Sequence, residues 1–178
     1  GSSVNVSTTS TGGLWSSHDP GVADVGALTG LVTGMSAMTP GVLGTGVTII
    51  TYTLPTGCFR TTNMTVNPLP NPITGPTDIC VGDVAMFYNA TPGGGWMSSN
   101  TAIGTIDGVT GLAGGISGGN TIISYVLPSA CVATRPLQVH DNPAPISGSL
   151  SVCAGFSTNL TSSPAGGTWS QAPSSMGY

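Results

Sequence analysis

Four cysteines are the chemically reactive residues of this chain with the most regular spacing. Cys58 and Cys131 lie 73 residues apart, and Cys80 and Cys153 are separated by the same 73 residues. Paired cysteines in small repeated units indicate an oxidising, extracellular setting. In a unit of about 73 residues a bridge would add roughly 2–4 kcal/mol of stability to a modest core.

A serine motif of hydrolases also occurs once. Residues 115–119 read Gly-Ile-Ser-Gly-Gly, which matches G-x-S-x-G. That motif works only on a strand-to-helix turn with triad partners. Here it sits in a glycine-rich loop with His140 as the one downstream histidine, so we interpret the match as chance. The chain has no lysine for a phosphate-binding P-loop. We therefore expect no enzyme activity and no cofactor.

A metal site would need a cluster of acidic residues and histidines, and the best candidate is His18 with Asp19 and Asp24. Asp78 and Asp83 flank Cys80, but a pair of acids in a loop does not make a calcium site. The residues of the next repeat that correspond to the first group cannot serve as such a set: Ser99, Asn100 and Thr105. We expect solvated loops and no metal.

Possible glycosylation sites are defined by four N-x-S/T sequons. They lie at Asn5, Asn63, Asn89 and Asn159. Asn5 and Asn159 hold the same position of the repeat, which would space glycans periodically. In a chain rich in serine and threonine, the alternative is that the sequons arise by chance.

The composition limits the possible partners. Only 4% of the residues are charged, against about a quarter in ordinary soluble proteins. The net charge of -4 and the two arginines argue against nucleic acid or anionic membranes. No stretch approaches the ~20 apolar residues of a membrane span. A weakly charged surface makes association with copies of itself electrostatically cheap.

One sequence phrase occurs three times, which indicates an array of small units. Trp15, Trp96 and Trp169 each follow a glycine pair, and Tyr52 and Tyr125 mark a later shared position. These aromatic residues are expected to anchor the cores. The repeats predict three domains: residues 1–70, lacking a first strand; 71–143, complete; and 144–178, the first half of a unit. Each incomplete unit is expected to be completed by adjacent polypeptide.

The complete unit shows short apolar runs separated by turn residues, which predicts seven strands in an antiparallel sandwich. The expected strands are residues 73–75, 84–88, one opening at Trp96, 102–106, 111–113, 121–127 and 132–139. Proline-rich linkers at residues 67–72 and 140–145 are expected to act as semi-rigid spacers that set the units end to end.

The first repeat carries about eight extra residues between Leu31 and Thr48. This insertion, with Met35, Thr39 and Leu43, is a possible lateral contact or binding loop. It is free of the packing constraint that the other repeats share.

The motif of the second repeat resembles a known family. Residues 96–106 (Trp-Met-Ser-Ser-Asn-Thr-Ala-Ile-Gly-Thr-Ile), residues 108–112 (Gly-Val-Thr-Gly-Leu) and residues 121–125 (Thr-Ile-Ile-Ser-Tyr) are similar to the bacterial immunoglobulin-like repeat of the Big2 type. The cysteine positions and the proline-rich segment that leaves the unit, residues 66–70 (Val-Asn-Pro-Leu-Pro), resemble repeats of giant secreted surface proteins of Bacteroidota. Gly104 departs from the motif, which usually has alanine there. The resemblance implies an all-β chain of tandem immunoglobulin-like sandwiches at the cell surface.

Three cysteine arrangements stay open. In a sandwich, the loops that hold Cys80 and Cys131 lie at opposite poles, which disfavours a bridge between them. Stacked repeats would let Cys131 bridge to the cysteine expected two positions before Gly1, in adjoining chain. A bridge within the unit and free thiols are the alternatives.

Together these features predict a structural component of an extracellular filament, stalk or adhesin shaft, with copies of itself or adjacent repeats as partners. One alternative is a binding module whose loops, such as residues 90–95 or the insertion, recognise a surface glycan or receptor. Another is a passive spacer in a larger secreted enzyme.

Overall fold

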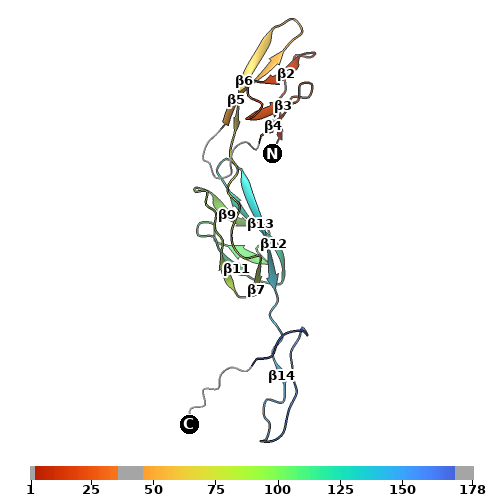
Figure 1. Ribbon diagram of the computed structural model, residues 1–178, viewed down its shortest axis with the longest axis vertical. Helices are drawn as coiled ribbons and strands as arrows, with labels where there is room; N and C mark the ends of the chain where they lie inside the picture. Colours follow the sequence, from red (N-terminus) through yellow and green to blue (C-terminus); the bar gives the residue numbers. More distant parts are fainter. Residues whose placement is uncertain (1–2, 36–45, 171–178) are drawn as a thin grey trace. The chain divides into compact units, whose positions relative to one another are not determined.

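A computed structural model describes residues 3–35 and 46–170 of the chain. These residues form fifteen β-strands and no helix, so the all-β prediction is confirmed. Among them, no helix has the length and apolar character needed to cross a bilayer. The chain divides into two compact units, Gly1–His140 and Asp141–Tyr178 (Figure 1). The first unit contains two of the three sequence repeats.

The second repeat is a sandwich of two sheets. One sheet has the order β10-β11-β8 and the other the order β7-β13-β12-β9. The strands are β7 (Asp78–Cys80), β8 (Val84–Met86), β9 (Gly95–Ser98), β10 (Gly104–Ile106), β11 (Leu112–Gly115), β12 (Gly119–Val126) and β13 (Val132–His140). In β12 and the second half of β13, buried and exposed residues alternate because side chains along a strand point to opposite faces. Phe87, Ile123 and Leu137 lie at the centre of the shared core.

The first repeat has the same sheets with one strand fewer. Its orders are β1-β4-β3 and β2-β5-β6. The strands are β1 (Ser3–Asn5), β2 (Leu14–Ser17), β3 (Ala23–Val25), β4 (Leu31–Gly34), β5 (Gly46–Thr53) and β6 (Phe59–Val66). Both repeats centre on an antiparallel hairpin paired over eight residues, β5 with β6 and β12 with β13. No counterpart of β7 lies beside β6 among the described residues.

The aromatic residues hold matching places in these two repeats. The rings of Trp96 and Tyr125 are buried with centroids 4.8 Å apart, and those of Trp15 and Tyr52 lie 4.7 Å apart. The Tyr125 hydroxyl donates to the Thr91 carbonyl at 2.6 Å and accepts from the Gly94 amide at 2.9 Å.

Tyr52 makes the corresponding bonds to Ser10 and Gly13, at 2.9 and 2.8 Å. A Cβ on Gly94 would lie 2.5 Å from the Tyr125 ring. This close approach explains the glycine that stands two positions before each of these tryptophans.

Residues 144–170 form only one short pair, β14 (Ser147–Gly148) with β15 (Leu160–Thr161). Trp169, expected as a core anchor, is 60% exposed. The strands that cover Trp96 in the second repeat have no counterparts among these residues, so no core forms around the third tryptophan.

Three details of the second repeat differ from the sequence prediction. The expected strand at residues 73–75 is a single bridge between Thr74 and Tyr88. The short strand β7 was not expected, and it pairs in parallel with the end of β13, whereas the other strand pairs of the described residues are antiparallel. His140, expected in a linker, is the last residue of β13.

Candidate functional site

The segment that begins the second repeat is fixed along its last strand. In the parallel register Asp78, Ile79 and Cys80 face Gln138, Val139 and His140. The Gln138 amide donates to the Thr77 carbonyl at 2.8 Å, and the Val81 amide donates to the His140 carbonyl at 2.9 Å. We call residues 73–81 together with residues 135–140 the strand clamp.

Arg135 holds the first part of the clamp. Its guanidinium donates to three backbone carbonyls of the opposite segment: those of Ile73 at 3.3 Å, Gly75 at 2.6 Å and Pro76 at 3.4 Å. The side chain is half-buried, and hydrogen bonds from a charged donor are stronger than neutral ones. Arg135 therefore fixes a stretch that lacks a regular strand.

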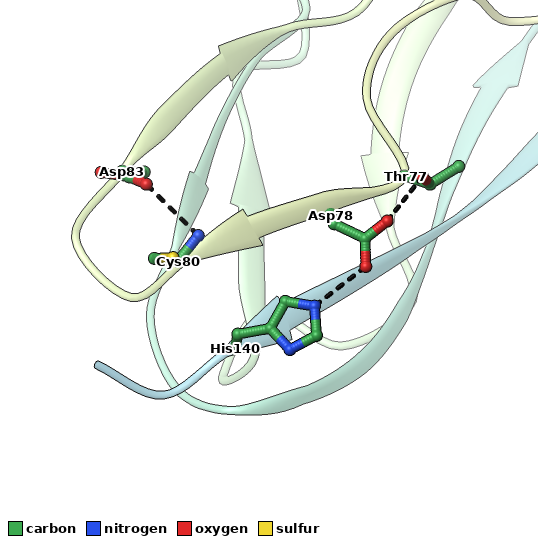
Figure 2. A network of polar contacts seen from close by, with 5 residues as sticks. All are labelled: Thr77, Asp78, Cys80, Asp83 and His140. Atoms are coloured by element: carbon green, nitrogen blue, oxygen red, sulfur yellow. Dashed lines mark hydrogen bonds and ion pairs between the residues drawn. The ribbon is translucent and has the colours of Figure 1, made fainter. Parts of the chain in front are cut away.

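Asp78 and His140 close the other end of the clamp (Figure 2). Nε2 of His140 lies 2.9 Å from Oδ1 of Asp78, and the Thr77 hydroxyl donates to Oδ2 at 2.6 Å. The Thr77 hydroxyl first, and the His140 ring second, lower the pKa of the Asp78 carboxyl below its ordinary value. The pair joins the first strand of this repeat to its last.

Cys80 ends β7 at this same pole, where its amide donates to Oδ2 of Asp83 at 3.3 Å (Figure 2). Cys131 precedes β13 at the opposite pole. Since Cys80 pairs with the last residue of β13, the two cysteines lie roughly 30 Å apart, at about 3.3 Å per residue. A disulfide needs Cα atoms within about 7 Å. A bridge between Cys80 and Cys131 within one repeat is therefore wrong.

Cys131 instead lies at the junction with the preceding repeat. Its thiol contacts the carbonyl of Asn67, the first residue after β6, at 3.8 Å. All four cysteines are free in this structure, and all but Cys131 are exposed. The bridge to adjoining chain stays a prediction.

The described residues of the first repeat form no clamp. The residues of its last strand region that correspond to Arg135 and His140 are Thr62 and Asn67. On β6, Met64 and Val66 are only partly buried, while the corresponding Leu137 and Val139 of β13 are fully buried. The edge covered by β7 in one repeat is therefore open in the other.

A shallow hollow of about 370 Å³ lies beside the loop that precedes β9. Its wall includes the loop residues 89–94, Tyr88 and Val109, and both of these side chains are well exposed. The first repeat has Ser7 where the second has Tyr88. The hollow of the second repeat therefore has an aromatic wall residue that the first repeat lacks.

The hydrolase-like motif has no triad geometry. The Ser117 hydroxyl donates to the Ala102 carbonyl at 2.8 Å, and His140 is bonded to Asp78. In the described residues, no three His, Cys, Asp or Glu side chains gather as metal ligands. Asp19 accepts from the Gly21 amide at 3.0 Å within its own turn.

The sequons lie in different surroundings. Asn5, Asn63 and Asn159 are exposed on the surface. Both amide atoms of Asn89 are used inside the protein, since Nδ2 donates to the Asn71 carbonyl and Oδ1 accepts from the Thr91 amide. A glycan on Asn89 would disrupt these bonds.

Of the insertion residues proposed as a contact loop, Met35 is exposed. Thr39 and Leu43 lie outside the described residues.

Sequence reasoning missed the clamp. Arg135 is one of two arginines in a chain without lysine, and that rarity is the signal that could have marked it. Asp78 and Thr77 gave no signal, because the parallel pair that brings them to His140 is three residues long.

No family model matches the chain, and no curated protein matches it. Among solved structures, the C-terminal 282-residue fragment of intimin, in complex with the intimin-binding domain of the translocated intimin receptor, has a TM-score of 0.40 and 15% identity over 84% of this chain. Domains 4–9 of surface layer protein SbsC have a TM-score of 0.29 and 16% sequence identity over 91% of this chain. Mouse cadherin-23 EC22-24 has a TM-score of 0.30 and 9% sequence identity over 73% of this chain.

The chain spans 60% of the length of the intimin fragment, 29% of the SbsC structure and 53% of the cadherin structure. At these scores the likeness identifies neither a family nor a function.

Proposed function

We propose that this chain is a load-bearing segment of an extracellular filament, stalk or adhesin shaft built from bacterial immunoglobulin-like repeats of the Big2 type. The observation that carries the proposal is the parallel pairing of the first and last strands of the second repeat. The chain enters this repeat at one end of the pair and leaves it at the other. Tension along the chain therefore loads the clamp hydrogen bonds together, in shear.

The side chains of the clamp reinforce this shear interface. Arg135 ties β13 to three carbonyls of the entering segment, and His140 ties it to Asp78. Antiparallel first and last strands would instead open one bond at a time under the same tension. The clamp is therefore suited to resist pulling.

The repetition of the core supports the same role. The tyrosine and tryptophan of the first and second repeats make the same ring contact, and each tyrosine hydroxyl makes the same pair of backbone bonds. A shaft needs many equal units, whereas a ligand site need occur only once. The low charge fits a secreted material whose units lie close together.

Single-molecule pulling tests the load-bearing role. With handles at the two ends of the chain, under reducing conditions, we expect the second repeat to unfold at a higher force than the first. The matched control carries Ser at Cys58, Cys131 and Cys153, the substitution Pro143→Cys, and handles on Cys80 and position 143. Force then peels β7 from β13, and the unfolding force should fall severalfold. Equal forces in both geometries would refute the load-bearing role.

A second candidate function is glycan recognition at the hollow beside residues 89–94. The exposed aromatic ring of Tyr88 favours it, since this ring lies at the hollow and is absent from the first repeat. A glycan array should then show specific binding that Tyr88→Ala abolishes and Leu28→Ala, in the first repeat, leaves intact. An array without specific binding would exclude this function for the sugars tested.

A further inference from the structure

The third repeat leaves exposed the apolar residues that the second repeat buries. Ile146 is 55% exposed, whereas the corresponding Ile73 is 4% exposed. Val152 is 53% exposed, whereas Ile79 is 8% exposed. In the second repeat these two isoleucines belong to the segment that lies on β13. Among the described residues, the third repeat thus contains the counterpart of the clamp segment with no last strand beside it.

The first repeat has the opposite deficiency. Its last strand, β6, is the edge of its sheet, and no strand lies on its outer side among the described residues. The Thr65 amide corresponds to the Gln138 amide, which donates to the Thr77 carbonyl in the second repeat. Met64 and Val66 are the partly buried residues along this edge.

We propose that residues 146–153 of a second copy of this chain add to the edge of β6 as a parallel strand. The register of β7 on β13 transfers directly, so that Ser151, Val152 and Cys153 of the second copy face Thr65, Val66 and Asn67. Val152 then occupies the place of the buried Ile79. Unpaired backbone groups of an edge strand are a known template for such strand addition.

The side chains at the new joint are compatible. Where the second repeat pairs His140 with Asp78, the joint sets Asn67 beside Ser151 of the second copy, two uncharged polar groups that can hydrogen-bond. The incoming segment must leave the short β14–β15 pair. In exchange its Ser147 can pair with Ser7 of the first copy. These two residues hold the places of Thr74 and Tyr88, which form a bridge in the second repeat. Few bonds are lost and two apolar side chains are buried.

The same joint brings two cysteines together. Cys153 of the second copy faces Asn67, whose carbonyl accepts the 3.8 Å contact from the Cys131 thiol. With oxidised glutathione as the oxidant, the two thiols lose two protons and two electrons as the S–S bond forms. Those electrons and protons convert one oxidised glutathione into two thiols. The result is a covalent joint between copies.

The proposed joint identifies a second copy of the chain as the partner within the proposed shaft, and it rests on the proposed function in this respect alone. The pulling experiment tests the second repeat within one chain, whereas the joint is tested by the mass of assemblies. Either result can fail while the other stands.

Light scattering of the reduced 178-residue chain over increasing concentration tests the joint. We expect dimers and longer oligomers. Val152→Asp should weaken association by at least about 100-fold, since it would bury a charge. The control Leu150→Asp, at a position whose counterpart Thr77 is exposed, should leave association unchanged. A chain that stays monomeric at every concentration, or two variants that behave alike, would overturn the proposal.

A mixing experiment separates strand addition from other association. Thr65→Pro removes the amide at the open edge of β6 and is tolerated on an edge strand. Each variant alone should be monomeric, but Thr65→Pro mixed with Val152→Asp should form a dimer and nothing longer, because one intact joint remains. Amide exchange confirms that both variants are folded. A mixture that stays monomeric, or that polymerises, contradicts the proposed joint.

The cysteines supply an independent readout. After oxidation, nonreducing mass spectrometry should identify a Cys131–Cys153 link between copies. Cys131→Ser or Cys153→Ser should abolish the covalent ladder but not the noncovalent oligomers, and Cys58→Ser or Cys80→Ser should change neither. Links distributed equally over all four cysteines would overturn the assigned register.

Discussion

The first and second repeats share their central hairpin and aromatic corner but differ at one edge. In the second repeat β7 covers β13, and the core gains Ile73 and Ile79. Among the described residues of the first repeat the same edge is open, and the cluster of buried core residues is smaller. The sandwich core therefore forms without the clamp, and the clamp completes its burial and joins the first strand to the last.

The largest expected difference between the repeats concerns the residues beneath the clamp. Leu137→Ala should cost about 2–5 kcal/mol of the free energy of unfolding, because it leaves a cavity in a fully buried site. Met64→Ala, at the matching position of the first repeat, should cost less, since Met64 is only partly buried. Native-state amide exchange reports each repeat separately. Equal losses of unfolding free energy in the two repeats would contradict the claim that the clamp completes the burial of the second core.

Arg135→Ala should destabilise the second repeat alone. The loss of a charged donor to three carbonyls is expected to cost about 1.5–3 kcal/mol. The exposed Arg60 on β6 is the matched control, and Arg60→Ala should change stability by less than about 0.5 kcal/mol. Amide exchange of residues 73–81 measures the effect. If residues 73–81 exchange as slowly in Arg135→Ala as in the parent chain, Arg135 does not hold this segment in place.

The tyrosine corner should behave alike in both repeats. Tyr125→Phe and Tyr52→Phe each remove a hydroxyl that bridges two backbone groups, at an expected cost of about 1–3 kcal/mol. The two losses, measured by amide exchange in the repeat concerned, should agree. A large loss of stability in only one repeat would show that the same hydrogen bonds stabilise the two repeats to different extents.

The smallest effect is a dependence of clamp stability on acid. Because the pKa of Asp78 is lowered in the folded chain, its contribution is present above the ordinary value of 3.8 and is lost as the pH falls through the folded value. Exchange at the Val81 amide should therefore speed up below pH 4 relative to the Tyr125 region. Asp78→Asn should abolish this difference. An unchanged acid response in that variant would assign it to another group.

Much of the fold was predictable because the repeat displays it three times. The alternation in β12 and β13 and the recurring Trp and Tyr positions predicted the sandwich and its anchors. Two of the three tryptophans lie beside their tyrosine, while Trp169 is exposed. A repeated phrase identifies a position in a unit, but burial there requires the strands that follow.

The clamp could not be predicted in the same way. Asp78-Ile79-Cys80 is too short to show a period and lies between turn residues, so its parallel pairing depends on tertiary packing. The role of Arg135 depends on backbone carbonyls about sixty residues earlier, and carbonyls carry no sequence signal. The opposite poles of Cys80 and Cys131 were expected from sandwich topology, and the register of β13 then excluded their bridge.

The most direct test of the account compares one amide in each repeat. In the dilute, reduced chain, hydrogen exchange should be slow at Gln138, whose amide donates to Thr77 across the clamp, and fast at Thr65, whose edge is open. Equal protection of these two amides in the monomeric chain would contradict the difference between the repeats on which both proposals rest.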